Sequence, residues 1–219
     1  MGSLWRVTPY VILLVPLTSC YMFSADIVGP DHPSIAPPPA EQPLRLVVGL
    51  SGREEVEVRT VNEAFPINGE FHELKALFAQ RLLELSLFQR VLYPVVPHDQ
   101  PDLSIQVNLQ VKFKPDWISL PKFLLTNLSL GLTAPMFVAE HRYVARGDLA
   151  IIHRDRIVKK YTAGSDIIIR IGMLAGHSLR SQPSLNQRAA FLARDSMITD
   201  LLHQLKQDHQ FLSQFEPSS

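Results

Sequence analysis

Leu103-Ser104-Ile105-Gln106-Val107-Asn108-Leu109-Gln110-Val111-Lys112-Phe113-Lys114 is the most regular stretch of this sequence. Apolar and polar residues alternate throughout it, and successive side chains of a β-strand point to opposite faces of a sheet. One face of this strand is therefore predicted to be buried, while the other meets water. A sheet with one wet face is typical of antiparallel or mixed packing, in which helices cover the dry face.

The residues before this strand predict a first strand and a first helix. Leu44 to Leu50 is a β-rich run that ends at Ser51-Gly52, and Val56 to Arg59 is a second short run that would extend it as a hairpin. A helical period begins after Asn68, a suitable N-cap residue, and continues to Tyr93-Pro94. The helix is predicted to end there because the residue before a proline disfavours the helical backbone conformation.

The residues after this strand predict a hairpin and a second helix. Arg142 to His153 and Ile157 to Ala163 are two strands joined by the turn Arg154-Asp155-Arg156. The following run, Gly164 to Gly172, either prolongs the hairpin or forms a short separate strand. Apolar residues at helical spacing predict a last helix from about Leu185 to Phe215.

Together these elements predict a single α+β domain over residues 44–215. The predicted order is β-α-β-β-β-α, a two-layer sandwich with two helices on one face of a mostly antiparallel sheet of about four strands. Hydrophobic residues make up 46% of the chain, which suffices for one sizeable core.

The first twenty residues have the order of a secretory signal. Arg6 precedes the apolar run Tyr10 to Val15, and small residues follow up to Cys20. The apolar run is too short for a permanent membrane-spanning helix. The alternative is that residues 7–17 form a core strand and that Cys20 is a buried thiol.

Leu17-Thr18-Ser19-Cys20 resembles the lipobox of bacterial lipoproteins. That resemblance implies a signal peptide of residues 1–19 and a mature chain that begins at Cys20, acylated with chains such as palmitate. Two or three acyl chains anchor a protein stably, whereas one holds it only reversibly. By the same resemblance, Tyr21 in place of an aspartate after the cysteine favours the outer membrane, with the protein facing the periplasm.

Residues 20–43 are predicted to be a lipidated, semi-rigid tether, because prolines recur along them and favour extended geometry. Lys plus Arg and Asp plus Glu both number 21, so no basic excess points to nucleic acid. Acylation of the only cysteine leaves no thiol for a disulfide. No cofactor and no metal site is predicted, since His203 and His209 are not spaced as a chelating pair on one helix face.

Residues 117–138 form an apolar insertion whose environment the sequence leaves open. Pro121, Gly131 and Pro135 divide it into pieces too short to span a bilayer as one helix. One interpretation is a buried hairpin or core loop, and the other is an exposed patch that touches a membrane, a partner or a second copy. The candidate contact residues are Trp117, Phe123, Leu124, Leu125, Leu128, Leu130, Leu132, Met136 and Phe137.

A wider resemblance rests on the order of these parts. The lipidated cysteine, the Pro-rich tether, the β-α-β-β-β-α order and the segment 130–135 before a strand hairpin led by Tyr143 resemble outer-membrane lipoproteins of the TolB-amino-terminal-domain type. That group includes the curli and Pel export lipoproteins and the lipoprotein activators of penicillin-binding proteins. Some members form rings, which implies that this chain is an oligomer.

Three hypotheses of function follow. The first is a non-catalytic outer-membrane lipoprotein that acts as a structural or assembly component of an envelope export or biogenesis system, as a homo-oligomer or with an envelope protein partner. The second is a lipopolysaccharide-assembly-like or lipid-transport accessory lipoprotein. The third, a periplasmic hydrolase, ranks last because no nucleophile, base and orienting group can be grouped, and Ser119-Leu120-Pro121-Lys122 lacks the companion motifs of a Ser-x-x-Lys enzyme.

Overall fold

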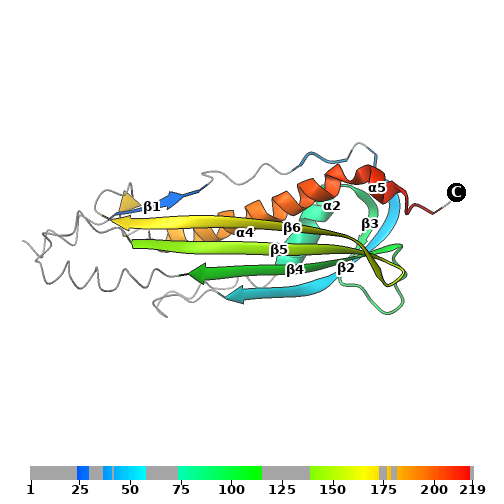
Figure 1. Cartoon of the computed structure of the whole chain (residues 1–219), viewed down its shortest axis with the longest axis horizontal. Coiled ribbons are helices and arrows are strands. Elements are labelled where there is room, and N and C mark those ends of the chain that lie inside the picture. The colour runs from blue at the N-terminus through cyan, green and yellow to red at the C-terminus, as the bar shows by residue number, and fades with distance from the viewer. Residues whose placement is uncertain are drawn as a thin grey trace, which may run out of the picture. The chain divides into compact units, whose positions relative to one another are not determined.

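The computed structural model describes residues 24–29, 37–40, 42–57, 74–114, 139–172, 177–178 and 182–217. Strands and helices follow one another along these residues as labelled in Figure 1. Their bounds are β1 Ser24–Val28, β2 Leu44–Glu57, α2 Leu74–Glu84, β3 Phe88–Leu92, β4 Leu103–Lys114, β5 Ala139–His153, β6 Arg156–Gly172, β7 His177–Ser178, α4 Gln182–Gln207 and α5 His209–Ser213.

The strands form one mixed sheet, which within the described residues has seven strands in the order β3-β2-β4-β5-β6-β1-β7. β2 runs parallel to β3 and β4, whereas β1 runs antiparallel to β6 and β7. The predicted α+β class is confirmed, but the sheet is larger and more mixed than the mostly antiparallel sheet of about four strands that the sequence predicted. The helix α2 lies between β2 and β3 in the chain, and such a crossover allows neighbouring strands to run parallel.

The most regular stretch of the sequence forms β4, with the predicted bounds. Its apolar side chains Leu103, Ile105, Val107, Leu109 and Val111 are at most 1% exposed. The alternation therefore identified both the strand and its buried face.

The first predicted strand continues through its predicted end. β2 runs from Leu44 to Glu57 without a turn at Ser51-Gly52, and it pairs with β4 from Val48 to Glu57. Gly52 has φ +141, a backbone conformation that residues with a side chain rarely adopt. The glycine was interpreted as the end of a strand, but it allows β2 and β4 to approach closely in mid-strand.

The first predicted helix is shorter than the periodicity suggested. In the described residues it ends at Glu84, Ser86 has φ 51, and Phe88–Leu92 form the edge strand β3 parallel to β2. Phe88 and Leu92, at the two ends of this strand, are buried. The spacing of the apolar residues was compatible with a longer helix and also with a separate strand. Pairing with β2 favoured the strand.

The predicted hairpin is confirmed and is longer than expected. β5 and β6 extend over Ala139–His153 and Arg156–Gly172, with Arg154 and Asp155 at positive φ in the turn. The run from Gly164 to Gly172 prolongs the hairpin. The last predicted helix is divided at Asp208 into α4 and the short α5.

The chain is divided into two compact units. The first comprises Met1–Asp31, Lys114–Arg142 and Ile167–Ala189, and the second comprises His32–Phe113, Tyr143–Asp166 and Ala190–Ser219. In the second unit, α2 and residues 190–207 of α4 cover the same side of the sheet (Figure 1). Their buried side chains, which include Phe78, Leu82, Met197, Leu201 and Leu205, meet the apolar sides of the strands to form the core.

Candidate functional site

The residues predicted from sequence to contact a membrane or a partner lie outside the described residues. Cys20 and the whole apolar insertion belong to this group. The strand ends that flank the insertion are described: β4 ends at Lys114 and β5 begins at Ala139. Both strand ends belong to the first compact unit, as does β1, the first described strand after Cys20.

The predicted tether contains a strand of the sheet. Ser24 pairs with Gly172 of β6 and with Ser178 of β7, and the pairing with β6 continues to Val28 opposite Ile168. The segment predicted to be a semi-rigid tether, residues 20–43, therefore includes the strand β1. The four residues from Cys20 to Ser24 can span at most about 14 Å, because an extended chain advances about 3.6 Å per residue.

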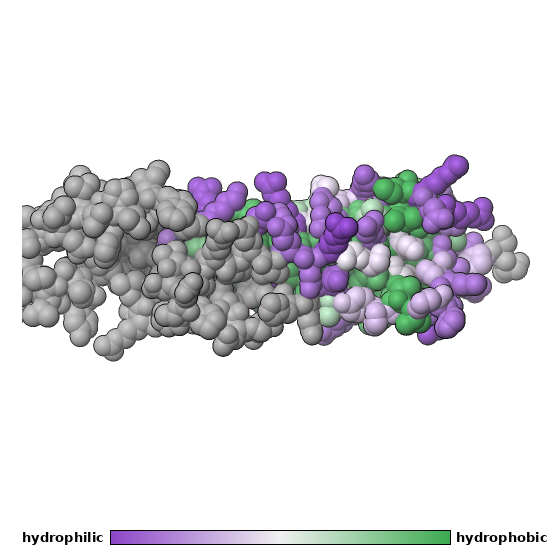
Figure 2. All heavy atoms as spheres, turned by 90° about the horizontal axis from the view of Figure 1, so that it is seen from below, coloured by the Kyte–Doolittle hydropathy of each residue, from purple (hydrophilic) through white to green (hydrophobic). Residues whose placement is uncertain are grey.

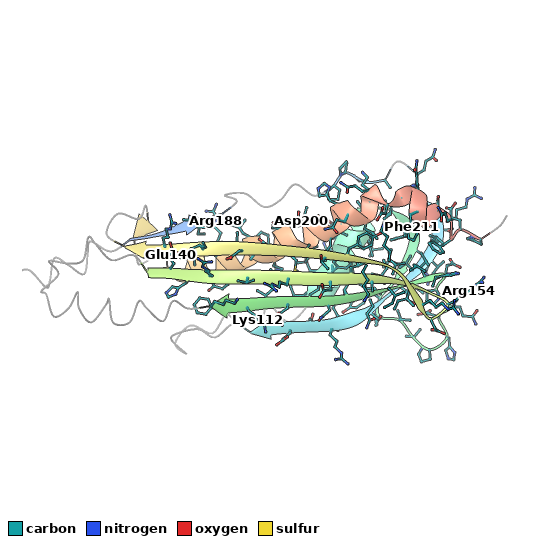
Figure 3. The ribbon with its side chains drawn as sticks, in the orientation of Figure 1. Lys112, Glu140, Arg154, Arg188, Asp200 and Phe211 are labelled. Carbon is teal, nitrogen blue, oxygen red and sulfur yellow. The ribbon has the colours of Figure 1, made fainter. Side chains whose placement is uncertain are left out.

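Charged side chains gather where β5 begins and β6 ends. Glu140, labelled in Figure 3, accepts a hydrogen bond from Arg170 Nε at 2.9 Å through Oε1. Its other carboxylate oxygen lies 3.8 Å from Arg142 Nη2. The side chains of Arg142 and Arg170 are 49% and 50% exposed, so two cations surround one anion in contact with solvent.

A second feature lies within the second unit, where part of the Pro-rich segment packs on the helices. Lys206 Nζ donates a hydrogen bond to Pro38 O at 2.6 Å, and Ala40 N donates one to Leu85 O at 2.8 Å. His209 Nε2 lies 3.2 Å from Gln42 O. We call residues 37–40, 42 and 43 the strap, because α2 and the C-terminal helices hold it at several points.

The strap covers one side of a hollow with a volume of about 300 Å³. Small-molecule pockets begin at about this size. The hollow is lined by Pro37, Pro38, Pro39, Arg81, Glu84, Leu85 and Leu202.

A buried ion pair connects the two helices beside this hollow. Arg81 Nη2 of α2 lies 3.3 Å from Oδ1 of Asp195 on α4, and Asp195 is 4% exposed. Burial raises the pKa of the Asp195 carboxyl, while the charges of Arg81 and Arg194 partly oppose that rise. Ionised Asp195 therefore depends on its cationic neighbours.

We expect Arg81→Gln to destabilise the fold by roughly 2–3 kcal/mol at neutral pH, since a buried carboxylate then loses a partner that is itself one third exposed. The loss should shrink as the pH falls through the folded pKa of Asp195, because a protonated carboxyl needs no cation. Urea unfolding over a pH series measures both effects. Arg81→Gln with Asp195→Asn is the control, and an equal loss at every pH would contradict the assignment.

A third cluster joins β6 to the C-terminal helices. Lys159 Nζ forms an ion pair with Asp208 and lies 5.0 Å from the ring centre of Phe211, which is labelled in Figure 3. Hydrogen bonding from Lys159 lowers the pKa of Asp208. Burial, together with Asp208, raises the pKa of Tyr161. The cluster fixes the start of α5 against the sheet, and we assign it a structural role.

Large hydrophobic side chains are exposed at several positions of the second unit, three of them within residues 93–96. In Figure 2, hydrophobic and hydrophilic side chains are interspersed among the coloured residues of the face shown. Much of the surface of any folded protein is apolar, so exposed apolar side chains do not by themselves mark a site. The exposed ones are Leu83, Tyr93, Val95, Val96, Ile157 and Phe191.

Neither a metal-binding cluster nor a membrane-spanning helix is present in the described residues. In the parts of the chain that the structure describes, no group of three His, Cys, Asp or Glu is arranged to hold a metal ion. Over the same residues, no helix has the length and apolar character needed to cross a membrane.

No family model matches the sequence, and no curated protein matches it either. Solved structures resemble the fold at low identity. A protein described as a neuraminyllactose-binding hemagglutinin homolog from Helicobacter pylori is 12% identical with a TM-score of 0.47, and the match covers 83% of this chain and 97% of that one.

Two further structures are more distant in fold. A Xanthomonas campestris protein of the DUF330 family is 11% identical with a TM-score of 0.39, over 81% of this chain and 97% of that one. A minor lipoprotein from Acinetobacter baumannii is 14% identical with a TM-score of 0.30, over 75% and 91%. These are distant similarities of fold, and they assign no function.

Proposed function

We propose that this protein is a non-catalytic outer-membrane lipoprotein, anchored through acylated Cys20 and facing the periplasm. In this proposal it acts as an oligomeric structural or assembly component of an envelope export or biogenesis system. The observation that carries the proposal is the position of β1. A strand that starts four residues after the lipidation sequence and pairs with β6 would couple an anchor directly to the sheet.

The apolar insertion gives this anchored protein a candidate means of assembly. It leaves β4 at Lys114 and returns at Ala139, in the compact unit that also contains β1. Its apolar residues would then be available near the anchor, either to a second copy or to the lipid surface. This supports the docking hypothesis over a catalytic one.

The test is the native mass of the mature lipoprotein, extracted from membranes in mild detergent. We expect a defined homo-oligomer that becomes a monomer when residues 119–136 are deleted. The deletion is matched by replacing the same residues with a Gly-Ser linker of equal length, so that loss of the apolar side chains is separated from loss of chain length. A monomer with the native sequence would overturn the oligomeric part of the proposal.

A lipid-transport accessory lipoprotein is the second candidate, and the hollow under the strap favours it. A volume of about 300 Å³ with proline and leucine in its lining could hold part of an acyl chain or another small apolar group. Mass spectrometry of lipids that copurify with the Cys20→Ser chain tests this candidate. If lipid copurifies at a stoichiometric amount, and the Leu202→Trp substitution prevents this, the result would favour lipid transport. If no lipid copurifies, the assembly role remains the favoured function.

A further inference from the structure

We propose that the sheet end formed by the start of β5, the start of β1 and the end of β6 binds the headgroups of anionic lipids in the membrane that holds Cys20, through Arg142 and Arg170. This inference rests on the proposed lipidation. We call this part of the molecule the anchored end. The anchored end would be a second membrane contact, in addition to the acyl chains.

The first argument is the length of chain between the lipid and the sheet. Ser24 pairs with Gly172, and Cys20 is four residues away, so Ser24 at the start of β1 lies within about 14 Å of the acylated residue. Arg170 lies two residues before Gly172 on β6 and opposite Asp26 of β1. The lipid attachment therefore places the arginine cluster within reach of the headgroup layer.

The second argument is charge. From Cys20 onward, the first unit contains six Lys or Arg and four Asp or Glu, while the second unit contains fourteen and seventeen. Although the whole chain has a formal charge of zero, its basic excess is in the unit that carries the anchor. Basic residues near an anionic leaflet are attracted to its surface.

The third argument is the geometry of the cluster. Glu140 orients both guanidinium groups, at 2.9 Å from Arg170 and 3.8 Å from Arg142, while each arginine side chain stays half exposed. A guanidinium has five N–H donors in a planar fork, so one that contacts a carboxylate can still bind a phosphate oxygen. The occupant that this arrangement fits is a phosphate-bearing lipid headgroup.

The experiment separates surface binding from simple tethering. The mature protein is purified with its lipid, with Lys114→Cys as the only reactive thiol because acylation occupies the Cys20 sulfur. A fluorophore on residue 114 then reports quenching by headgroup-spin-labelled lipid in vesicles of phosphatidylethanolamine and phosphatidylglycerol. A flexible Gly-Ser insertion of about twelve residues between Phe23 and Ser24 lengthens the tether by roughly 20 Å.

We expect strong quenching with the native tether and also with the long tether. In the long-tether protein, the double substitution Arg142→Gln with Arg170→Gln should lower the equilibrium constant for contact between the anchored end and the membrane about 30-fold. Each basic residue near an anionic surface contributes about 1 kcal/mol to that contact. The matched control is Arg156→Gln with Lys160→Gln, which removes the same charge from exposed residues of the second unit and should leave quenching unchanged.

Loss of quenching on lengthening the tether alone would overturn the inference, because tethering would then explain the proximity. Equal effects of the two double substitutions would overturn it as well. Quenching that returns only with an acidic protein partner would assign the arginines to that partner instead. Intact mass measured before reconstitution tests the proposed function separately, and an unlipidated Cys20 would overturn both proposals.

Discussion

Gly52→Ala is expected to destabilise the second unit by at least about 3 kcal/mol, from backbone strain and a steric clash together. Gly52 has φ +141, and a Cβ at that position would overlap the carbonyl oxygen of Val107 and stand 2.7 Å from its carbonyl carbon. Val107 is its register partner on β4. Because the clash involves backbone atoms, only a separation of the two strands can relieve it.

Two other glycines provide graded controls in urea unfolding. At Gly147 an added Cβ would lie 2.8 Å from Leu201 Cδ1 and 3.1 Å from Met197 Sδ, which are side-chain atoms that can move, so Gly147→Ala should lose about 1 kcal/mol. At Gly164 its nearest neighbour would be Ala145 O at 3.6 Å, and Gly164→Ala should stay within about 0.5 kcal/mol. If Gly52→Ala were as mild as Gly164→Ala, the close pairing of β2 and β4 would be wrong.

The same glycine shows why the sequence predicted this part of the fold incompletely. The local sequence predicts a turn at Ser51-Gly52, because glycine often marks a turn at the end of a strand. The alternative, a close approach of a strand that lies fifty-five residues further on, depends on which strands become neighbours. Alternation identified β4 and its buried face and favoured an antiparallel or mixed sheet, but it did not identify β2 as a neighbour that runs parallel to β4.

For Phe88–Leu92, the local pattern could not decide between a helix and a strand. Their apolar positions continue the helical period of α2, yet they form β3 beside β2. In the structure the helix ends at Glu84, and Ser86 adopts φ 51 between the helix and the strand. Serine is not among the usual residues for that conformation, so the stop could not be read from composition alone.

Part of the anchored end could have been found from sequence. In a hairpin that turns at residues 154–156, positions 140 and 170 are equally distant from Asp155, so Glu140 and Arg170 are expected to face each other, as they do at 2.9 Å. The contribution of β1 could not be found in this way. Its residues lie within a Pro-rich segment, and Ser24–Val28 form a strand because β6 offers a partner.

The strap was missed for a related reason. Prolines at 37–39 indicate an extended chain, and the structure holds the segment that contains them against α2 and α4. The prolines favour extended geometry, but they carry no information about which part of the domain the segment contacts. Contacts such as that from Lys206 to Pro38 span well over a hundred residues, and no local pattern predicts them.

The largest expected effect on the molecule's location is that of Cys20→Ser. A hydroxyl in place of the sulfur removes the thioether link to the lipid, so the protein should move almost completely from the membrane fraction to the soluble fraction, because stable anchoring requires at least two acyl chains. Cell fractionation with labelled palmitate measures the change. Ser19→Ala keeps a small residue before the thiol and should leave both labelling and membrane retention intact.

The stability of the Cys20→Ser protein separates anchoring from folding. Residue 20 precedes the first described strand by four positions, so its free energy of unfolding should lie within about 0.5 kcal/mol of that of the native chain. A released and equally stable protein would assign the thiol to lipid attachment. Retention at the membrane without label would show that other residues hold the protein there, and a large loss of stability would favour the alternative in which Cys20 is a buried core residue.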